Sequence, residues 1–107
     1  MFSLYQLDQI AGASDAIDAI NPILVARIRR AAEPMTGHEI AACLGDAITN
    51  AAAARHLCNW EEAQLGGATP DAIVDAEYHD DLAAAWSLVA SEHPSLRADL
   101  LVARLGP

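Results

Sequence analysis

The chain has 107 residues and carries 15 acidic residues against six basic ones, which gives a formal net charge of −9 at pH 7. This length suits one domain with its own core, so we predict a single all-helical domain over residues 1–107. The acidic balance disfavours non-specific attraction to nucleic acid or anionic lipid, and no apolar run is long enough to span a membrane.

Apolar residues make up 53% of the chain, but aromatic residues make up only 5%. A core poor in large rings and rich in alanine requires helices that approach each other closely. No alternating β-branched run is present, so no sheet is expected. We predict an all-α fold: a compact domain of six to seven short helices that cross at steep angles and include a helix-turn-helix-like pair.

The first third of the chain contains three predicted helices. Capping and stop signals place the first two over residues 3–12 and 14–20. Asn21-Pro22 is a cap followed by a first-turn proline, which predicts a third helix to about Glu33 with Leu24, Ile28 and Ala31 on its apolar side.

Three arginines on this third helix, Arg27, Arg29 and Arg30, form a basic cluster. The simpler interpretation is a solvated face on which Arg29 pairs with Glu33 four residues later. The alternative is a contact with phosphate or with an acidic partner.

Residues 36–57 predict two short helices joined by a tight turn. Thr36 and Glu39 form a capping box that begins the first helix, and Gly45 suits a left-handed cap that ends it. Thr49 is placed to cap a second helix that continues to Leu65. The predicted buried positions of this second helix are Ala53, Leu57 and Trp60.

This stretch resembles the helix-turn-helix family. The resemblance is carried by Glu39-Ile40-Ala41, Leu44-Gly45, Ile48-Thr49, Ala53 and Arg55-His56-Leu57. The turn is longer than the common form of the family by Asp46 and Ala47, and the second helix offers mainly alanine. The resemblance implies a DNA-binding regulator that acts as a dimer. Its candidate DNA contacts are Arg27, Arg29, Arg30, Thr49, Asn50 and Arg55.

The remaining chain predicts two more helices. Gly66-Gly67 is a break, and Thr69-Pro70 restarts a helix that reaches about Ser91. A last helix is expected over residues 95–105, either covering the core or forming a homodimer contact. The predicted apolar face of the long helix comprises Val74, Tyr78, Leu82, Ala85, Trp86 and Val89.

The sequence offers little for catalysis. His79 and Asp75 share a helix face, but a metal site needs at least three ligands. His56 and Cys58 lie two residues apart and point to different sides of a helix. No phosphate-binding loop or hydrolase motif occurs. We therefore predict a non-enzymatic protein without cofactor or metal. Its cysteines are expected to be reduced and its location cytoplasmic, because no leader is apparent.

The second half of the chain is the acidic one. From residue 61 to the end there are nine acids and two arginines. Carboxylates on a rigid helix can imitate nucleic-acid phosphates and occupy a basic groove. Our first hypothesis is therefore a protein that binds a partner with a basic surface, with inhibition of a nucleic-acid-handling complex as its finer form. DNA binding is the alternative. The predicted partner-binding residues are Glu61, Glu62, Asp71, Asp75, Glu77, Asp80 and Asp81.

Overall fold

The computed structural model describes residues 21–94. Within this range the chain forms three α-helices and no strand: α2 (Pro22–Ala32), α3 (Gly37–Leu65) and α4 (Pro70–Glu92). The all-α prediction is confirmed. Of the six to seven predicted helices, four fell in this part of the chain, and three are found there because the two predicted over residues 36–65 form one helix, α3. The helices predicted over residues 3–12, 14–20 and 95–105 lie outside the described residues.

Three predicted helix starts, at Asn21, Thr36 and Thr69, are confirmed by their hydrogen bonds. The side chain of Asn21 accepts from the backbone N–H groups of the first turn of α2. The hydroxyl oxygen of Thr36 accepts from the N–H of Glu39 at 3.2 Å, and the Glu39 carboxylate accepts from the N–H of Thr36 at 3.2 Å, which completes the capping box. Thr69 caps α4 in the same way as Thr36 caps α3.

The turn predicted between residues 45 and 49 is absent, which corrects the helix-turn-helix interpretation of residues 36–57. The backbone is helical from Gly37 to Leu65 without a break. Gly66, with φ of 77°, is the glycine with a left-handed backbone among the described residues, and it ends α3. The Thr49 hydroxyl donates to the carbonyl of Gly45 at 2.9 Å and caps nothing.

The continuity of α3 has a physical reason. One glycine inside a helix costs about 1 kcal/mol relative to alanine. Leu44, before the predicted turn, and Ala47 and Ile48, within it, are all buried in the core. A break at Gly45 would remove one set of these side chains from the partner helix, so tertiary packing outweighs the weak local signal.

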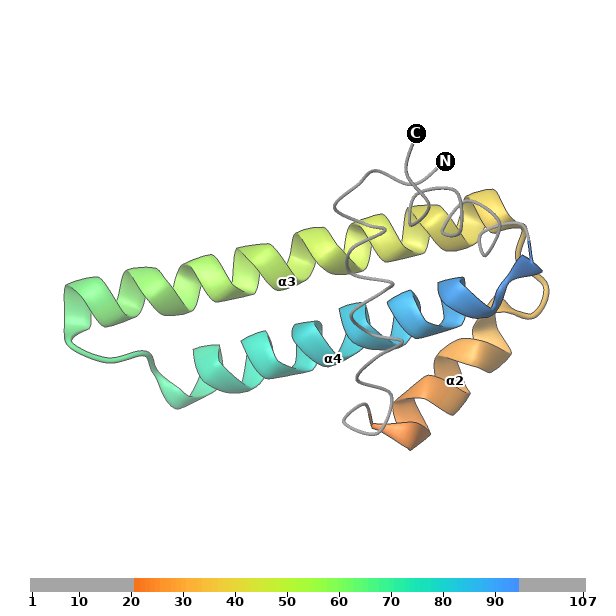
Figure 1. Ribbon diagram of the computed structural model, residues 1–107. Coiled ribbons are helices and arrows are strands. Elements are labelled where there is room, and N and C mark those ends of the chain that lie inside the picture. The colour runs from red at the N-terminus through yellow and green to blue at the C-terminus, as the bar shows by residue number, and fades with distance from the viewer. Residues whose placement is uncertain (1–20, 95–107) are drawn as a thin grey trace, which may run out of the picture.

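Helices α3 and α4 form a long antiparallel hairpin, joined by the short connection after Gly66 (Figure 1). Small side chains line its interior, with Ala51 and Ala54 of α3 and Ala72 and Ala83 of α4 all buried. Alanine at the contact permits close approach of the two axes. This confirms the expectation of close packing but corrects that of steeply crossed helices.

Helix α2 crosses the C-terminal half of α4 (Figure 1). Leu24, Val25 and Ile28 are buried there in the common core. Ala32 is buried in place of the predicted Ala31, a shift of one position. Among the described residues, no helix combines the length and the apolar character needed to cross a bilayer.

Candidate protein-binding surface

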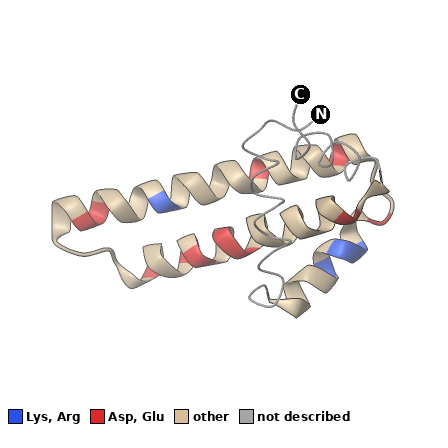
Figure 2. Cartoon of the chain, in the orientation of Figure 1, with Lys and Arg blue, Asp and Glu red and all other residues tan. Residues whose placement is uncertain are grey.

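Charge is unevenly distributed over the hairpin. Residues 56–94 contain eight acids and no lysine or arginine. Figure 2 shows acids on both helices near the α3–α4 connection, whereas the arginines of α2 lie beside the other half of the hairpin. Six of these acids belong to α4, and most of those lie in its first half. The connection end of the hairpin therefore carries a concentrated negative charge.

Three of the seven predicted partner-binding acids are engaged within the hairpin. Glu61 accepts hydrogen bonds from both the N–H and the hydroxyl of Thr69, at 3.0 Å each to Oε2, and so ties the end of α3 to the start of α4. The Oδ1 of Asp80 forms an ion pair with the Nη2 of Arg55 in α3 at 2.6 Å. Asp75 lies 3.5 Å from the Nε2 of His79. The contacts of Glu61 and Asp80 join α3 to the start and body of α4, whereas the contact of Asp75 with His79 lies within α4.

Four acids of α4, Asp75 among them, are arranged around an exposed apolar line. Successive residues of an α-helix are rotated by about 100°. Val74 and Tyr78, four residues apart, therefore lie along one line on the side of α4 away from α3. Glu77 and Asp81 follow one edge of this line, and Asp71 and Asp75 follow the other. We call these six residues, Asp71, Val74, Asp75, Glu77, Tyr78 and Asp81, the acidic stripe of α4.

The apolar centre of the acidic stripe is open to solvent. The side of α4 that faces α3 is marked by the buried Ala72 and Ala83, and Val74 lies about 200° around the helix from Ala72. Val74 is 64% exposed and Tyr78 is 50% exposed. Both side chains were predicted to lie in the core, and this prediction is wrong. Large apolar groups framed by charge are typical of a surface that meets another molecule.

A second exposed apolar patch lies on α3. Leu57 and Trp60, predicted to be buried, are 47% and 53% exposed. The neighbouring Cys58 faces α4, because its thiol donates to the carbonyl of Ala72 at 3.1 Å. Trp60 lies two residues further and so points nearly opposite. This patch therefore faces away from the acidic stripe, on the other side of the hairpin.

The predicted DNA-binding residues fall into two groups that lie on different helices. Arg27, Arg29 and Arg30 are on α2, and Thr49, Asn50 and Arg55 are on α3. Arg55 is bound to Asp80, as described above. DNA binding stays a prediction, but the short recognition helix on which it depended is part of the continuous α3.

Arg29 pairs with Glu92 of α4, not with Glu33 as predicted. Its Nε donates to Oε2 at 2.9 Å and its Nη2 to Oε1 at 2.5 Å, a two-point contact that the planar guanidinium favours. The hydrogen bonds to Glu92 raise the pKa of Arg29 above its ordinary value. Arg29 thus joins α2 to the C-terminal end of α4.

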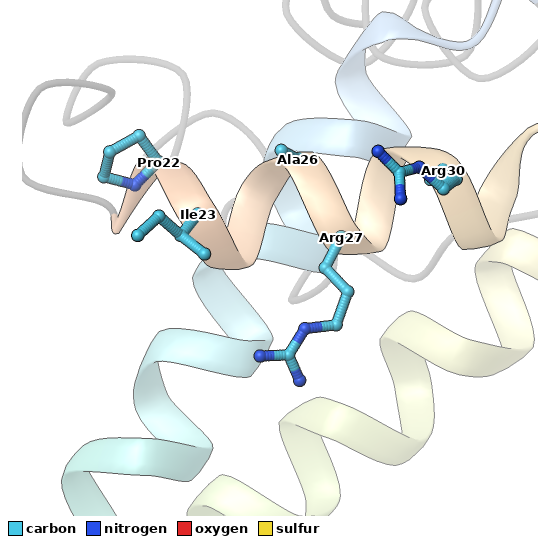
Figure 3. A pocket seen from close by; sticks show the side chains of 5 residues that line it. All are labelled: Pro22, Ile23, Ala26, Arg27 and Arg30. Carbon is cyan, nitrogen blue, oxygen red and sulfur yellow. The ribbon is translucent and has the colours of Figure 1, made fainter.

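Arg27 and Arg30 make no ion pair with any described residue. They border an open hollow of about 450 Å³ together with Pro22, Ile23 and Ala26. Figure 3 shows the two guanidinium groups extending in different directions from α2. They do not converge on one ligand position, so this hollow is a weaker candidate than the acidic stripe.

The possible catalytic groups remain isolated within the described range. His79 has Asp75 as its neighbour, and its Nδ1 is buried without a hydrogen-bond partner. Residues 21–94 contain no group of three side chains suited to hold a metal ion. Burial, and then the charges of Asp46 and Glu39, raise the pKa of the Cys43 thiol, which disfavours the reactive thiolate at neutral pH.

Sequence reasoning found four acids of the stripe but missed Val74 and Tyr78 as surface residues. Helical periodicity joins them to the buried Ala85 and Val89, so the pattern alone indicates one core face. A signal was nevertheless available in the sequence. Acids occur on both edges of the line at Val74 and Tyr78, where a buried face would be bordered by further apolar residues.

Comparison of the chain with protein-family models, curated proteins and solved structures gives no match.

Proposed function

We propose that this protein is a non-enzymatic binding protein that acts through a protein partner and meets a basic surface of that partner with the acidic stripe of α4. The observation that carries this proposal is the setting of Val74 and Tyr78. These exposed apolar side chains have acids on both edges, and residues 56–94 contain no lysine or arginine.

The stripe has the two components that a protein interface uses. Apolar side chains at its centre gain free energy when a partner removes them from water, at about 25 cal/mol for each Å². Acids at the edges speed encounter with a basic partner and reject an acidic one. Imitation of nucleic acid, the finer form of our hypothesis, is not part of the proposal, because Glu61 and Asp80 are engaged inside the hairpin.

Charge reversal on one edge of the stripe tests the proposal. The double variant Glu77→Lys/Asp81→Lys leaves the Arg55–Asp80 pair intact and changes exposed side chains alone. We expect immobilised wild-type protein to capture a basic protein from a lysate of the source cells, and the variant to lose it. Quantitative mass spectrometry of the captured material is the measurement.

The matched control is Glu33→Lys/Asp46→Lys, which makes the same change of net charge at exposed positions outside α4. Capture should persist in this control, and both variants should melt within a few degrees of the wild type because surface substitutions have small effects. Capture that survives reversal of the stripe, or that is lost equally in the control, would contradict the proposed surface.

A further inference from the structure

Within the described part of the chain, the half of α4 that carries the acidic stripe continues a face that α2 covers in the other half. The line through Val74 and Tyr78 extends along the helix with spacings of three and four residues. Its members are Val74, Tyr78, Ala85, Leu88 and Glu92, together with Asp81, which lies at the edge of the line between Tyr78 and Ala85. Such spacing keeps side chains on one side of a helix, as in the contact seam of paired helices. The line is thus a single helix-binding seam in two halves.

The half nearer to the C-terminus shows how this seam is covered. Ala85 is fully buried and Leu88 is 4% exposed, in the same core cluster as Leu24 and Ile28 of α2. Glu92, at the end of the line, holds Arg29 of α2 by two hydrogen bonds. The covering element is therefore a short amphipathic helix that offers aliphatic side chains to the line and an arginine to its acid.

The other half has the same components, and within residues 21–94 its apolar side chains are exposed. Val74 and Tyr78 repeat the apolar positions, and Asp81 at the edge of the line supplies an acid. Three more acids border this half, Asp71, Asp75 and Glu77, so it needs more positive charge from its occupant than the α2 side does. A second copy of the same stripe would bring like charges together, which disfavours a symmetric contact.

We infer that the acidic stripe of α4 binds an amphipathic α-helix of the partner, with aliphatic side chains at spacings of three and four residues and with arginine or lysine on both flanks. This inference rests on the proposed function and specifies its partner element. The partner helix lies on Val74 and Tyr78 as α2 lies on Ala85 and Leu88. Its basic residues meet the acids along the two edges of the stripe.

Two synthetic peptides separate this inference from the proposed function. Both are fluorescein-labelled 18-residue peptides of the same leucine, alanine and arginine composition. In the first, leucines recur at spacings of three and four residues with arginines beside them. In the second, the order is scrambled so that no helical face is apolar. Fluorescence anisotropy with the full-length protein gives both dissociation constants at physiological salt.

We expect the patterned peptide to bind at least about tenfold more tightly than the scrambled one, because only a helical face can bury Val74 and Tyr78 together. Val74→Ser/Tyr78→Ser should remove that advantage. The matched control Leu57→Ser changes an exposed apolar residue on α3 and should preserve it. Circular dichroism of each variant checks that its helices are intact.

The other outcomes decide between the two claims. Equal binding of both peptides, weakened by Glu77→Lys/Asp81→Lys, would overturn the helix inference and leave the proposed function standing. Failure of both peptides to bind would contradict both claims. An advantage that is lost in Leu57→Ser and kept in Val74→Ser/Tyr78→Ser would place the helix on α3. A dimer in sedimentation that Val74→Ser/Tyr78→Ser converts to a monomer would assign the face to a second copy and overturn the inference.

Discussion

Cys43 lies in α3 among groups that disfavour its ionisation. Partial burial raises the pKa of its thiol, and the carboxylates of Asp46 and Glu39 raise it further, since a negative charge nearby opposes formation of the thiolate. Glu39 is fixed by its role in the capping box. Asp46 is exposed and has no such role, so its charge can be removed without disturbing the start of the helix.

We predict that Asp46→Asn makes Cys43 more reactive. Removal of this carboxylate lowers the thiol pKa toward its ordinary value, so more thiolate is present at pH 8 and alkylation is faster. The rate of iodoacetamide labelling of the peptide that contains Cys43, followed by mass spectrometry, is the measurement. Glu62→Gln, which removes a distant charge of the same helix, is the control. Equal rates in the wild type and both variants would show that Asp46 has no influence on the thiol.

Single acidic residues also show which contacts sequence alone can predict and which it cannot. Glu61 and Asp80 look like Glu77 and Asp81 in the sequence, as members of an acidic segment. The structure gives the first two internal partners, Thr69 and Arg55. Asp80 and Arg55 are 25 residues apart, and pairing at that separation depends on the register of the hairpin, which spacing along one helix does not encode.

At the scale of the elements, local signals predicted the ends of helices well. The caps at Asn21, Thr36 and Thr69 and the stop at Gly66 are all formed as expected. Each depends on a side chain or on a backbone freedom that acts within a few residues. Gly45 was misjudged because its local signal competes with burial of side chains on both sides, and burial depends on α4.

The continuity of α3 gives a test with proline. Asp46→Pro removes a backbone donor in the middle of α3 and places the ring against the preceding turn, so we expect a loss of about 3 kcal/mol or more of unfolding free energy. A chain that turned at residues 45–48 would tolerate this proline. Urea unfolding followed by circular dichroism measures the difference.

The same substitution at the start of α3 is the matched comparison. Gly37 is the first residue of the helix, where proline removes no helical hydrogen bond. Gly37→Pro should therefore change the unfolding free energy by less than about 1 kcal/mol. If Asp46→Pro proves as mild as Gly37→Pro, the backbone near residue 46 is not helical and the helix-turn-helix interpretation returns.

At the scale of the whole molecule, the described residues combine a closely packed hairpin with a surface on which charge is unevenly distributed. Alanines at the α3–α4 contact allow the two long helices to build a narrow core, and α2 covers only part of the outer side of α4. The part left open is the one in which acids surround Val74 and Tyr78. The net charge of −9 predicted, in general terms, an acidic protein that binds a basic partner. The position of the stripe required the fold.

Photo-crosslinking tests the central claim most directly, because it reports which surface touches the partner. p-Benzoylphenylalanine in place of Tyr78 puts a reactive ketone at the centre of the stripe. In place of Leu57 it puts the same group on the exposed patch of α3. Both proteins are irradiated in a lysate of the source cells, and crosslinked peptides are identified by mass spectrometry. We predict crosslinks from position 78 to an arginine- or lysine-rich segment of one partner, and none to that partner from position 57. Crosslinks from position 57 alone, or from position 78 to segments without basic residues, would contradict the account.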